Sequence, residues 1–274
     1  MFSLIKIEWL KIKKYPAFWW MLAIVTLTYP GTNMMFYYIY SKSINGKEVA
    51  NNVAKMLLGN PFAFPETWHT VAFLSSVFII IPSILVIMLV TNEYNYKTHR
   101  QNIIDVWSRN QFVTSKLFDV LIISLVSTMV FTLVASIFGM YADPDNLNRW
   151  AEQLQYIPLF FIQTFAQLTV AFLIGFLIKK AFIALGFFLF YDLILEKIAV
   201  GYLRFKTDDL GRFLPLEISN RILPWPAFTN RFGKDAKDWY VKSVAAIPEF
   251  LIYTFILTAA IWAFCYYLHK RRDL

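Results

Sequence analysis

Long apolar stretches separated by polar segments dominate this sequence of 274 residues. A helix rises about 1.5 Å per residue, so about 20 apolar residues are needed to cross about 30 Å of hydrocarbon. Six stretches have about that length, and we predict a transmembrane helix in each. The predicted spans are residues 17–40, 70–91, 117–141, 156–178, 181–199 and 247–268. The pattern therefore predicts an all-α integral membrane protein with about six transmembrane helices, in which residues 1–274 form a single transmembrane domain.

Prolines and a lysine pair modify several of these spans. Pro30-Gly31 lies in the middle of the first span, and we expect it to kink or break the helix there. Pro82 lies inside the second span. Lys179-Lys180 ends the fourth span, so the fifth follows with almost no loop.

The first 16 residues predict a separate helix before the first span. Apolar residues recur there at helical spacing and form one stripe, namely Phe2, Ile5, Trp9 and Ile12. Lys11 and Lys13 lie off this stripe. An interfacial helix on the cytoplasmic surface explains the pattern, with Trp9 on its apolar side. The alternative is a basic flank of the first span.

Residues 200–246 form a long segment between the fifth and sixth spans. The segment is rich in large apolar residues, which Pro215, Pro224 and Pro226 interrupt. This composition predicts short helices that pack on the outer leaflet or dip into it. Two roles remain open, a folded cap over a pathway and an interfacial packing element without a gating role.

Composition and charge agree with a membrane protein. Hydrophobic residues make up 58% of the chain and charged residues only 16%, whereas a soluble domain carries about 25% charge. The formal net charge of +8 would suggest a nucleic-acid partner in a soluble protein. Here the basic residues gather beside the apolar spans, where they set orientation. We therefore predict a lipid bilayer as the environment and no nucleic-acid partner.

The distribution of Lys and Arg also predicts the topology. With the N-terminus inside, the inner segments hold 13 of these residues. The outer segments hold only four when residues 200–246 are set aside, because long loops cross largely regardless of charge. We therefore predict a multi-pass protein of the cell membrane, with both termini in the cytoplasm.

Sequence motifs for catalysis or for cofactor binding are missing. The chain has no phosphate-binding G-x-x-x-x-G-K-[ST] loop, no H-E-x-x-H and no G-x-S-x-G. The histidines, His69, His99 and His269, fall in separate loops or termini, and Cys265 is the only cysteine. We therefore predict that this chain has no catalytic residues, binds no metal and binds no cofactor itself.

Acidic residues late in the fifth span form a candidate intramembrane polar site. Asp192 and Glu196 lie there beside Lys197, and Glu196 has Lys197 or a neighbouring helix as its possible partner. The simpler interpretation is that they mark the outer membrane interface. An integral membrane enzyme acting on lipid would have to use these carboxylates, or His69 with Glu66. A channel or a non-transporting membrane partner is a further alternative.

The segment after the second span, residues 92–116, carries the most information. Glu93 precedes Lys97 and Asp105 precedes Arg109 at the i, i+4 spacing that supports a helix. An apolar patch lies between these charges, namely Ile103, Ile104, Val106 and Trp107. This pattern indicates a surface helix that docks a cytosolic partner, with a solvated loop as the alternative.

This segment resembles the first cytoplasmic loop of permease subunits of ABC exporters of the type-2 class, also called type V exporters. Their pattern is an acidic residue closing the second span, an aromatic-rich Thr-x-Arg run, a basic residue and a Lys opening the third span. Glu93, Thr98-His99-Arg100-Gln101-Asn102, Arg109 and Lys116 match it. The order of predicted helices resembles the family as well, although residues 200–246 are more basic than expected outside.

The resemblance implies an ATP-driven exporter of a hydrophobic or amphipathic substrate. The permease would pair with a second copy or a paralogue, and with two cytosolic ABC ATPase subunits that hold ATP and Mg. Residues 94–109 would form a coupling helix seated in the ATPase, with the N-terminal helix alongside and a pathway lined by the first, second and fifth spans. The implied coupling residues are Glu93, Tyr96, Thr98, Arg100, Gln101, Asn102, Asp105 and Arg109.

Overall fold

The structure is a computed structural model that describes residues 9–44, 59–95, 109–142, 144–206, 209–226 and 234–271. All regular secondary structure in these ranges is helical. The predicted coupling helix, apart from its ends, lies outside the described residues. The main helices are α2 (Pro16–Ile44), α4 (Glu66–Ser76), α5 (Ile80–Asn95), α7 (Arg109–Ala142), α8 (Tyr156–Ile178), α9 (Ala181–Phe190), α10 (Glu196–Lys206) and α13 (Ile247–Arg271).

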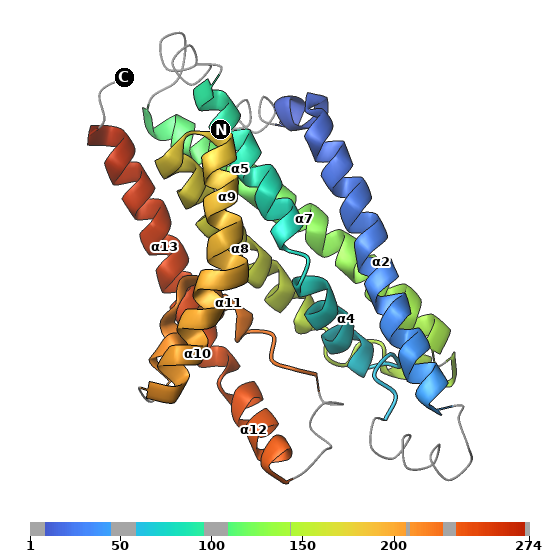
Figure 1. Ribbon diagram of the computed structural model, residues 1–274. Coiled ribbons are helices and arrows are strands. Elements are labelled where there is room, and N and C mark those ends of the chain that lie inside the picture. The colour runs from blue at the N-terminus through green and yellow to red at the C-terminus, as the bar shows by residue number, and fades with distance from the viewer. Residues whose placement is uncertain are drawn as a thin grey trace.

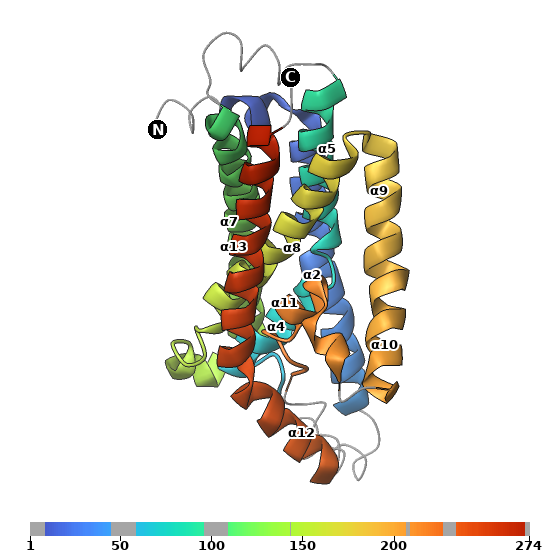
Figure 2. The same cartoon turned by 90° about the vertical axis from the view of Figure 1, so that its left-hand side faces the viewer.

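The long helices run up and down between two ends of a bundle (Figure 1). At one end, which we call the Glu93 end, α2 and α7 begin, α5 and α13 finish, and α8 turns into α9 (Figures 1 and 2). At the opposite end, α2 and α7 finish and α4 and α8 begin. A short turn of π-helix, Tyr191–Leu195, joins α9 to α10 without interruption. Along the described residues the passes follow in the order α2, α4 with α5, α7, α8, α9 with α10, and α13.

Length and apolar composition qualify three helical stretches as membrane spans. These are Gln111–Ala142, Tyr156–Ile178 and Ile247–Arg271. The pair α4 and α5 qualifies as a fourth if it is counted as one bent span. The described residues therefore form an all-α membrane protein with three or four apolar spans by these criteria. That α2 and the run from α9 to α10 also cross the membrane remains a prediction.

The first predicted span corresponds to α2. Of the two outcomes predicted at Pro30, a break is wrong, and a kink stays a prediction. The helix continues through Pro30 for 29 residues in all. Nearby side chains supply extra hydrogen bonds, because Asn33 Nδ2 donates to the carbonyl of Tyr29 at 2.7 Å and Thr32 Oγ1 donates to the carbonyl of Thr28. In hydrocarbon a broken helix would leave backbone groups without partners, so a helix that continues past proline is favoured.

The second predicted span is two helices instead of one. α4 and α5 meet at an angle of 48° across residues 77–79. Pro82 accounts for a bend at this place, because it has no N–H to donate to the carbonyl of Phe78, four residues earlier, and its ring would clash with that carbonyl in a continuous helix. The bend therefore lies just before the proline that sequence reasoning singled out.

The core of the bundle lies around α8. This helix packs against α5, α7 and α13 and contributes large aromatic side chains that are completely buried. Phe160 stacks on Phe131 of α7 with ring centroids 4.5 Å apart, and Phe172 stacks on Trp262 of α13 at the same distance. Aromatic stacking on both sides therefore fixes α7 and α13 against the central helix.

The segment that follows α10 folds back onto the bundle. It contains η3 (Leu210–Phe213), α11 (Pro215–Asn220) and α12 (Lys234–Ala245). α11 packs against α8 and α13, and Figure 2 shows it between the long helices, whereas α12 extends away at the end opposite Glu93. Apolar side chains of α11 and of the residues just after it enter the core, namely Leu216, Ile218, Ile222 and Leu223. The expected short helices are present as α11 and α12, whereas their place at the outer leaflet and the cap role stay predictions.

Candidate functional site

Glu93 lies at the centre of a charge cluster that joins three segments of the chain. It is in the last turn of α5, and its Oε1 accepts a hydrogen bond from Lys116 Nζ in α7 at 2.8 Å. The same oxygen lies 3.4 Å from Lys11 Nζ, in the short helix formed by residues 9–14. Lys116 also donates to Asp119 Oδ2 at 2.7 Å. These four charges sum to zero, and we call them the Glu93 cluster.

Burial makes the Glu93 cluster stronger than an ordinary surface ion pair. The side chains of Lys116 and Asp119 are 2% and 5% exposed, and that of Glu93 is 13% exposed, whereas Lys11 is 36% exposed. Removing one partner of a buried pair leaves an uncompensated charge at low dielectric and costs about 3–5 kcal/mol. The link from α5 to α7 is therefore firm, and the link to the N-terminal helix is weaker.

Further contacts connect the Glu93 end of the bundle. Asn92 Nδ2 donates to the hydroxyl of Tyr15 at 2.6 Å, which gives the N-terminal segment a second link to α5. The ammonium of Lys179, at the end of α8, lies 5.1 Å from the centre of the Tyr94 ring. Thr114 and Tyr266 share a hydrogen bond of 2.8 Å between α7 and α13. The helix ends on both sides of residues 96–108 therefore belong to one packed platform.

The structure places only some of the residues that sequence reasoning selected for this site. Trp9, 41% exposed, contacts Phe18 edge to face, and the carbonyl of Lys13 accepts a hydrogen bond from the Trp19 indole. Arg109 is the first residue of α7. The other selected residues lie outside the described part of the chain, namely Tyr96, Thr98, Arg100, Gln101, Asn102 and Asp105.

Sequence reasoning missed Asp119 and the partnership of Lys11 with Glu93. Lys116 and Asp119 are three residues apart at the start of an apolar span, a spacing that places two side chains on one helical face. That pair of opposite charges was the available signal for Asp119. No local signal indicates Lys11, because its contact joins residues that are 82 positions apart.

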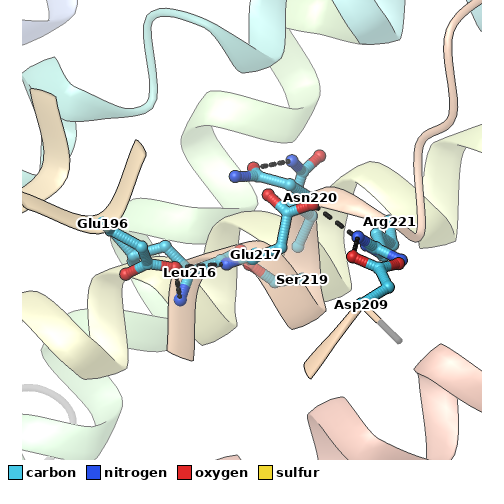
Figure 3. A network of polar contacts seen from close by, with 8 residues as sticks. Glu196, Asp209, Leu216, Glu217, Ser219, Asn220 and Arg221 are labelled. Atoms are coloured by element: carbon cyan, nitrogen blue, oxygen red, sulfur yellow. Dashed lines mark hydrogen bonds and ion pairs between the residues drawn. The ribbon is translucent and has the colours of Figure 1, made fainter. Parts of the chain in front are cut away.

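Glu196 of the candidate intramembrane polar site is buried and holds α11 (Figure 3). Its Oε1 accepts hydrogen bonds from the backbone N–H groups of Leu216 at 2.9 Å and Glu217 at 2.6 Å. These amides belong to the first turn of α11, where N–H groups have no partner within the helix. The negative carboxylate therefore caps this short helix. Both partners considered from sequence are observed, because Glu196 accepts hydrogen bonds from the neighbouring helix and also interacts electrostatically with Lys197.

Asp192 lies one helical turn before Glu196. It is half-buried, and both carboxylates lie close enough to Lys197 to interact with its charge. That the two form an intramembrane polar site stays a prediction. Other polar contacts continue from α11 to its neighbours. Asn220 Oδ1 accepts from Gln163 and Gln167 of α8, at 3.0 and 2.7 Å. The arrangement around Glu196 therefore serves to position α11.

His69 and Glu66, the other candidates for an enzyme site, are also held by structural contacts. His69 Nε2 donates to the carbonyl of Pro224 at 2.8 Å, and its ring stacks on Tyr156 at 4.1 Å. Glu66 accepts a hydrogen bond from Gln153 at 3.1 Å. Within the described residues there is no group of three or more His, Cys, Asp or Glu side chains that could hold a metal ion.

The comparison with protein families identifies the family to which this chain belongs. The sequence profile of the family described as "ABC-2 family transporter protein" matches residues 4–194. The chain belongs to this family. Comparisons with curated proteins and with solved structures gave no match. The matched residues of the ABC-2 permease include the N-terminal helix, the whole Glu93 cluster and the segment between α5 and α7.

Family membership establishes the general role of the chain. The ABC-2 permease is the membrane component of an ABC transporter, and this family works with an ABC ATPase subunit. Its members generally have no ATPase site of their own. The residues on both sides of 96–108 therefore become the part of the molecule to consider for contact with that ATPase.

Proposed function

We propose that this ABC-2 permease is the transmembrane subunit of an ATP-driven exporter of a hydrophobic or amphipathic substrate. ATPase subunits dock at the Glu93 end, where residues 94–109 act as the coupling helix. The observation that supports this proposal is the Glu93 cluster. It links α5 and α7, the two helices that flank the coupling segment, to the helix formed by residues 9–14.

Motion of the ATPase reaches the membrane helices through this cluster. The coupling segment is attached to α5 at one end and to α7 at the other, and Glu93 and Lys116 join these helices by a buried ion pair. Because breaking such a pair costs several kcal/mol, α5 and α7 move together when the segment is displaced. Lys11 passes part of that motion to the N-terminal helix, which acts as the connecting helix.

The proposed topology has six crossings with both termini in the cytoplasm of a cell. The crossings are α2, α4 with α5, α7, α8, α9 with α10, and α13. Support comes from the short flanks at the Glu93 end, which carry closely spaced basic residues, namely Lys13, Lys14, Lys179, Lys180, Lys270 and Arg271. Basic residues in short flanks favour the cytoplasmic side.

The proposed transporter is a dimer of this chain with a second copy or a paralogue. α5 packs against α2 and against α9, so both helices are its neighbours. α2 and α9 carry large apolar side chains that are highly exposed, among them Trp20 at 71%, Leu27 at 73% and Phe182 at 90%. A pathway between two permeases at this face would suit a substrate with apolar surface.

Co-purification tests the proposal. The tagged full-length chain is isolated in mild detergent, and soluble proteins that accompany it are identified by mass spectrometry. We expect a stoichiometric protein with a phosphate-binding loop, which is lost when residues 98–108 are scrambled. The matched control scrambles residues 236–245 of α12, at the opposite end, and should retain the ATPase. Loss of the ATPase from the control alone would contradict the assigned docking end.

A further inference from the structure

Three hydroxyl groups in the middle of the bundle are completely buried and have no partner. They are the hydroxyls of Tyr29 in α2, Ser127 in α7 and Thr164 in α8, and these residues are at most 1% exposed. None of the three hydroxyls makes a hydrogen bond within the described part of the chain. Unpartnered buried polar groups are rare in native proteins, and each requires an explanation.

Ring contacts place these hydroxyls in one layer of the bundle. Phe160 stacks on Phe131 with ring centroids 4.5 Å apart, and the Tyr29 ring meets Phe160 edge to face at 6.2 Å. Ser127 is one helical turn before Phe131, and Thr164 is one turn after Phe160. Because α7 and α8 run in opposite directions, both hydroxyls lie on the same side of this aromatic contact (Figure 1).

The Tyr29 hydroxyl reaches the same layer. Side chains on a helix lean toward its N-terminus, and α2 and α7 both start at the Glu93 end. Tyr29 therefore leans toward the Glu93 end, which is also the direction from Phe131 to Ser127. The three hydroxyls therefore come from three helices and lie on the side of the Phe131–Phe160 contact that is nearer the Glu93 end.

The Ser127 hydroxyl differs from its neighbours on α7. Ser124, Thr128, Thr132 and Ser136 each donate to the carbonyl four residues earlier at 2.8 Å, which is the usual solution for a hydroxyl in an apolar helix. Ser127 does not use this solution, although the same carbonyl pattern is available to it. Its hydroxyl is therefore buried without a hydrogen-bond partner among the described residues.

We propose that Tyr29, Ser127 and Thr164 bind ordered water between α2, α7 and α8. The three hydroxyls are uncharged, and each can donate and accept a hydrogen bond. They therefore suit a small neutral ligand that can also donate and accept hydrogen bonds. Buried water typically makes about three hydrogen bonds to groups that lack other partners. This site joins α2 to the core helices by exchangeable hydrogen bonds, and it does not depend on the proposed docking of the ATPase.

Radiolytic hydroxyl-radical footprinting tests the site in the full-length protein. Radicals formed from bound water oxidise the side chains beside it, even where bulk water has no access. We expect Phe131 and Phe160 to be oxidised several-fold faster than Phe172, which is equally buried but stacks on Trp262 in another layer. Oxidation of Phe131 and Phe160 no faster than that of Phe172 would overturn the proposal.

Variants identify the groups that hold the water. The triple variant Tyr29→Phe, Ser127→Ala, Thr164→Val removes all three hydroxyls and should reduce the oxidation of Phe131 at least threefold. Ser124→Ala is the matched control, because it removes a hydroxyl from the same helix that already has a backbone partner. Equal reduction in the control and the triple variant would refute the assignment. The single variant Ser127→Ala provides the same comparison if the triple variant does not fold.

Discussion

Neutralising Glu93 tests how strongly its cluster holds the helices at this end of the bundle. Glu93→Gln keeps the size of the side chain and removes one of the two negative charges beside Lys116. The Lys116 side chain is only 2% exposed, so water cannot replace the lost charge. Breaking a buried pair costs about 3–5 kcal/mol. Asp119 remains 2.7 Å from the ammonium and offsets part of that loss.

The expected loss is therefore about 2–3 kcal/mol, below the full value for a buried pair. At roughly 2–4 °C per kcal/mol for a chain of this size, Tm falls by about 4–12 °C. Intrinsic tryptophan fluorescence during heating in detergent measures Tm. The size of this fall in Tm depends on the burial of the ion pair, because an ion pair of the same length on the surface should contribute little to stability.

Glu152→Gln is the matched control. Glu152 forms an ion pair of 2.7 Å with Arg149, but both side chains are 52% exposed. The guanidinium lowers the pKa of the Glu152 carboxyl, so the charge that is removed is fully present at neutral pH. We expect Tm to stay within about 1 °C of the parent value, since surface substitutions have small effects. Equal losses in Glu93→Gln and Glu152→Gln would refute the argument from burial.

Three further predictions address the helices and the topology. Pro30→Ala should raise Tm, because α2 is continuous and alanine restores a backbone N–H, whereas a marked fall would show that the proline is required. Glu196→Gln should lower the stability by about 1 kcal/mol, as expected for a weakened helix cap, and Asp192→Asn should have less effect in the same thermal assay. Single cysteines at Asn146→Cys and Lys237→Cys, in a variant without the native cysteine, should react with a membrane-impermeant maleimide on intact cells. Reaction at position 237 only after permeabilisation would require a different topology for the last two spans.

Apolar length was enough to locate most helices from the sequence. The predicted span 156–178 corresponds to α8, whose 23 residues have the same bounds. Hydrocarbon requires every backbone group to be paired within the segment, so a long apolar stretch leaves few options besides a helix. The same requirement explains why Pro30 does not break α2. The bend at residues 77–79 lies about one turn before Pro82, so the proline was the available sequence signal for it.

The candidate site was only partly accessible from sequence. Glu93 and Lys116 belong to a local pattern, and the pair of charges at Lys116 and Asp119 could have been recognised. The contacts of Lys11 with Glu93 and of Glu196 with α11 could not, because they depend on how distant segments pack. Sequence reasoning therefore finds the ends of the proposed coupling segment but not the connections that hold them.

Photocrosslinking on each end of the bundle tests the central claim most directly. A photoreactive amino acid replaces Trp107, between α5 and α7, or Trp239, in α12 at the opposite end. The full-length permease is then irradiated in cells that also produce its ABC ATPase. The proposed docking predicts a crosslink to the ATPase from position 107 and none from position 239. A crosslink from position 239 alone would contradict both the docking site and the orientation of the permease in the membrane.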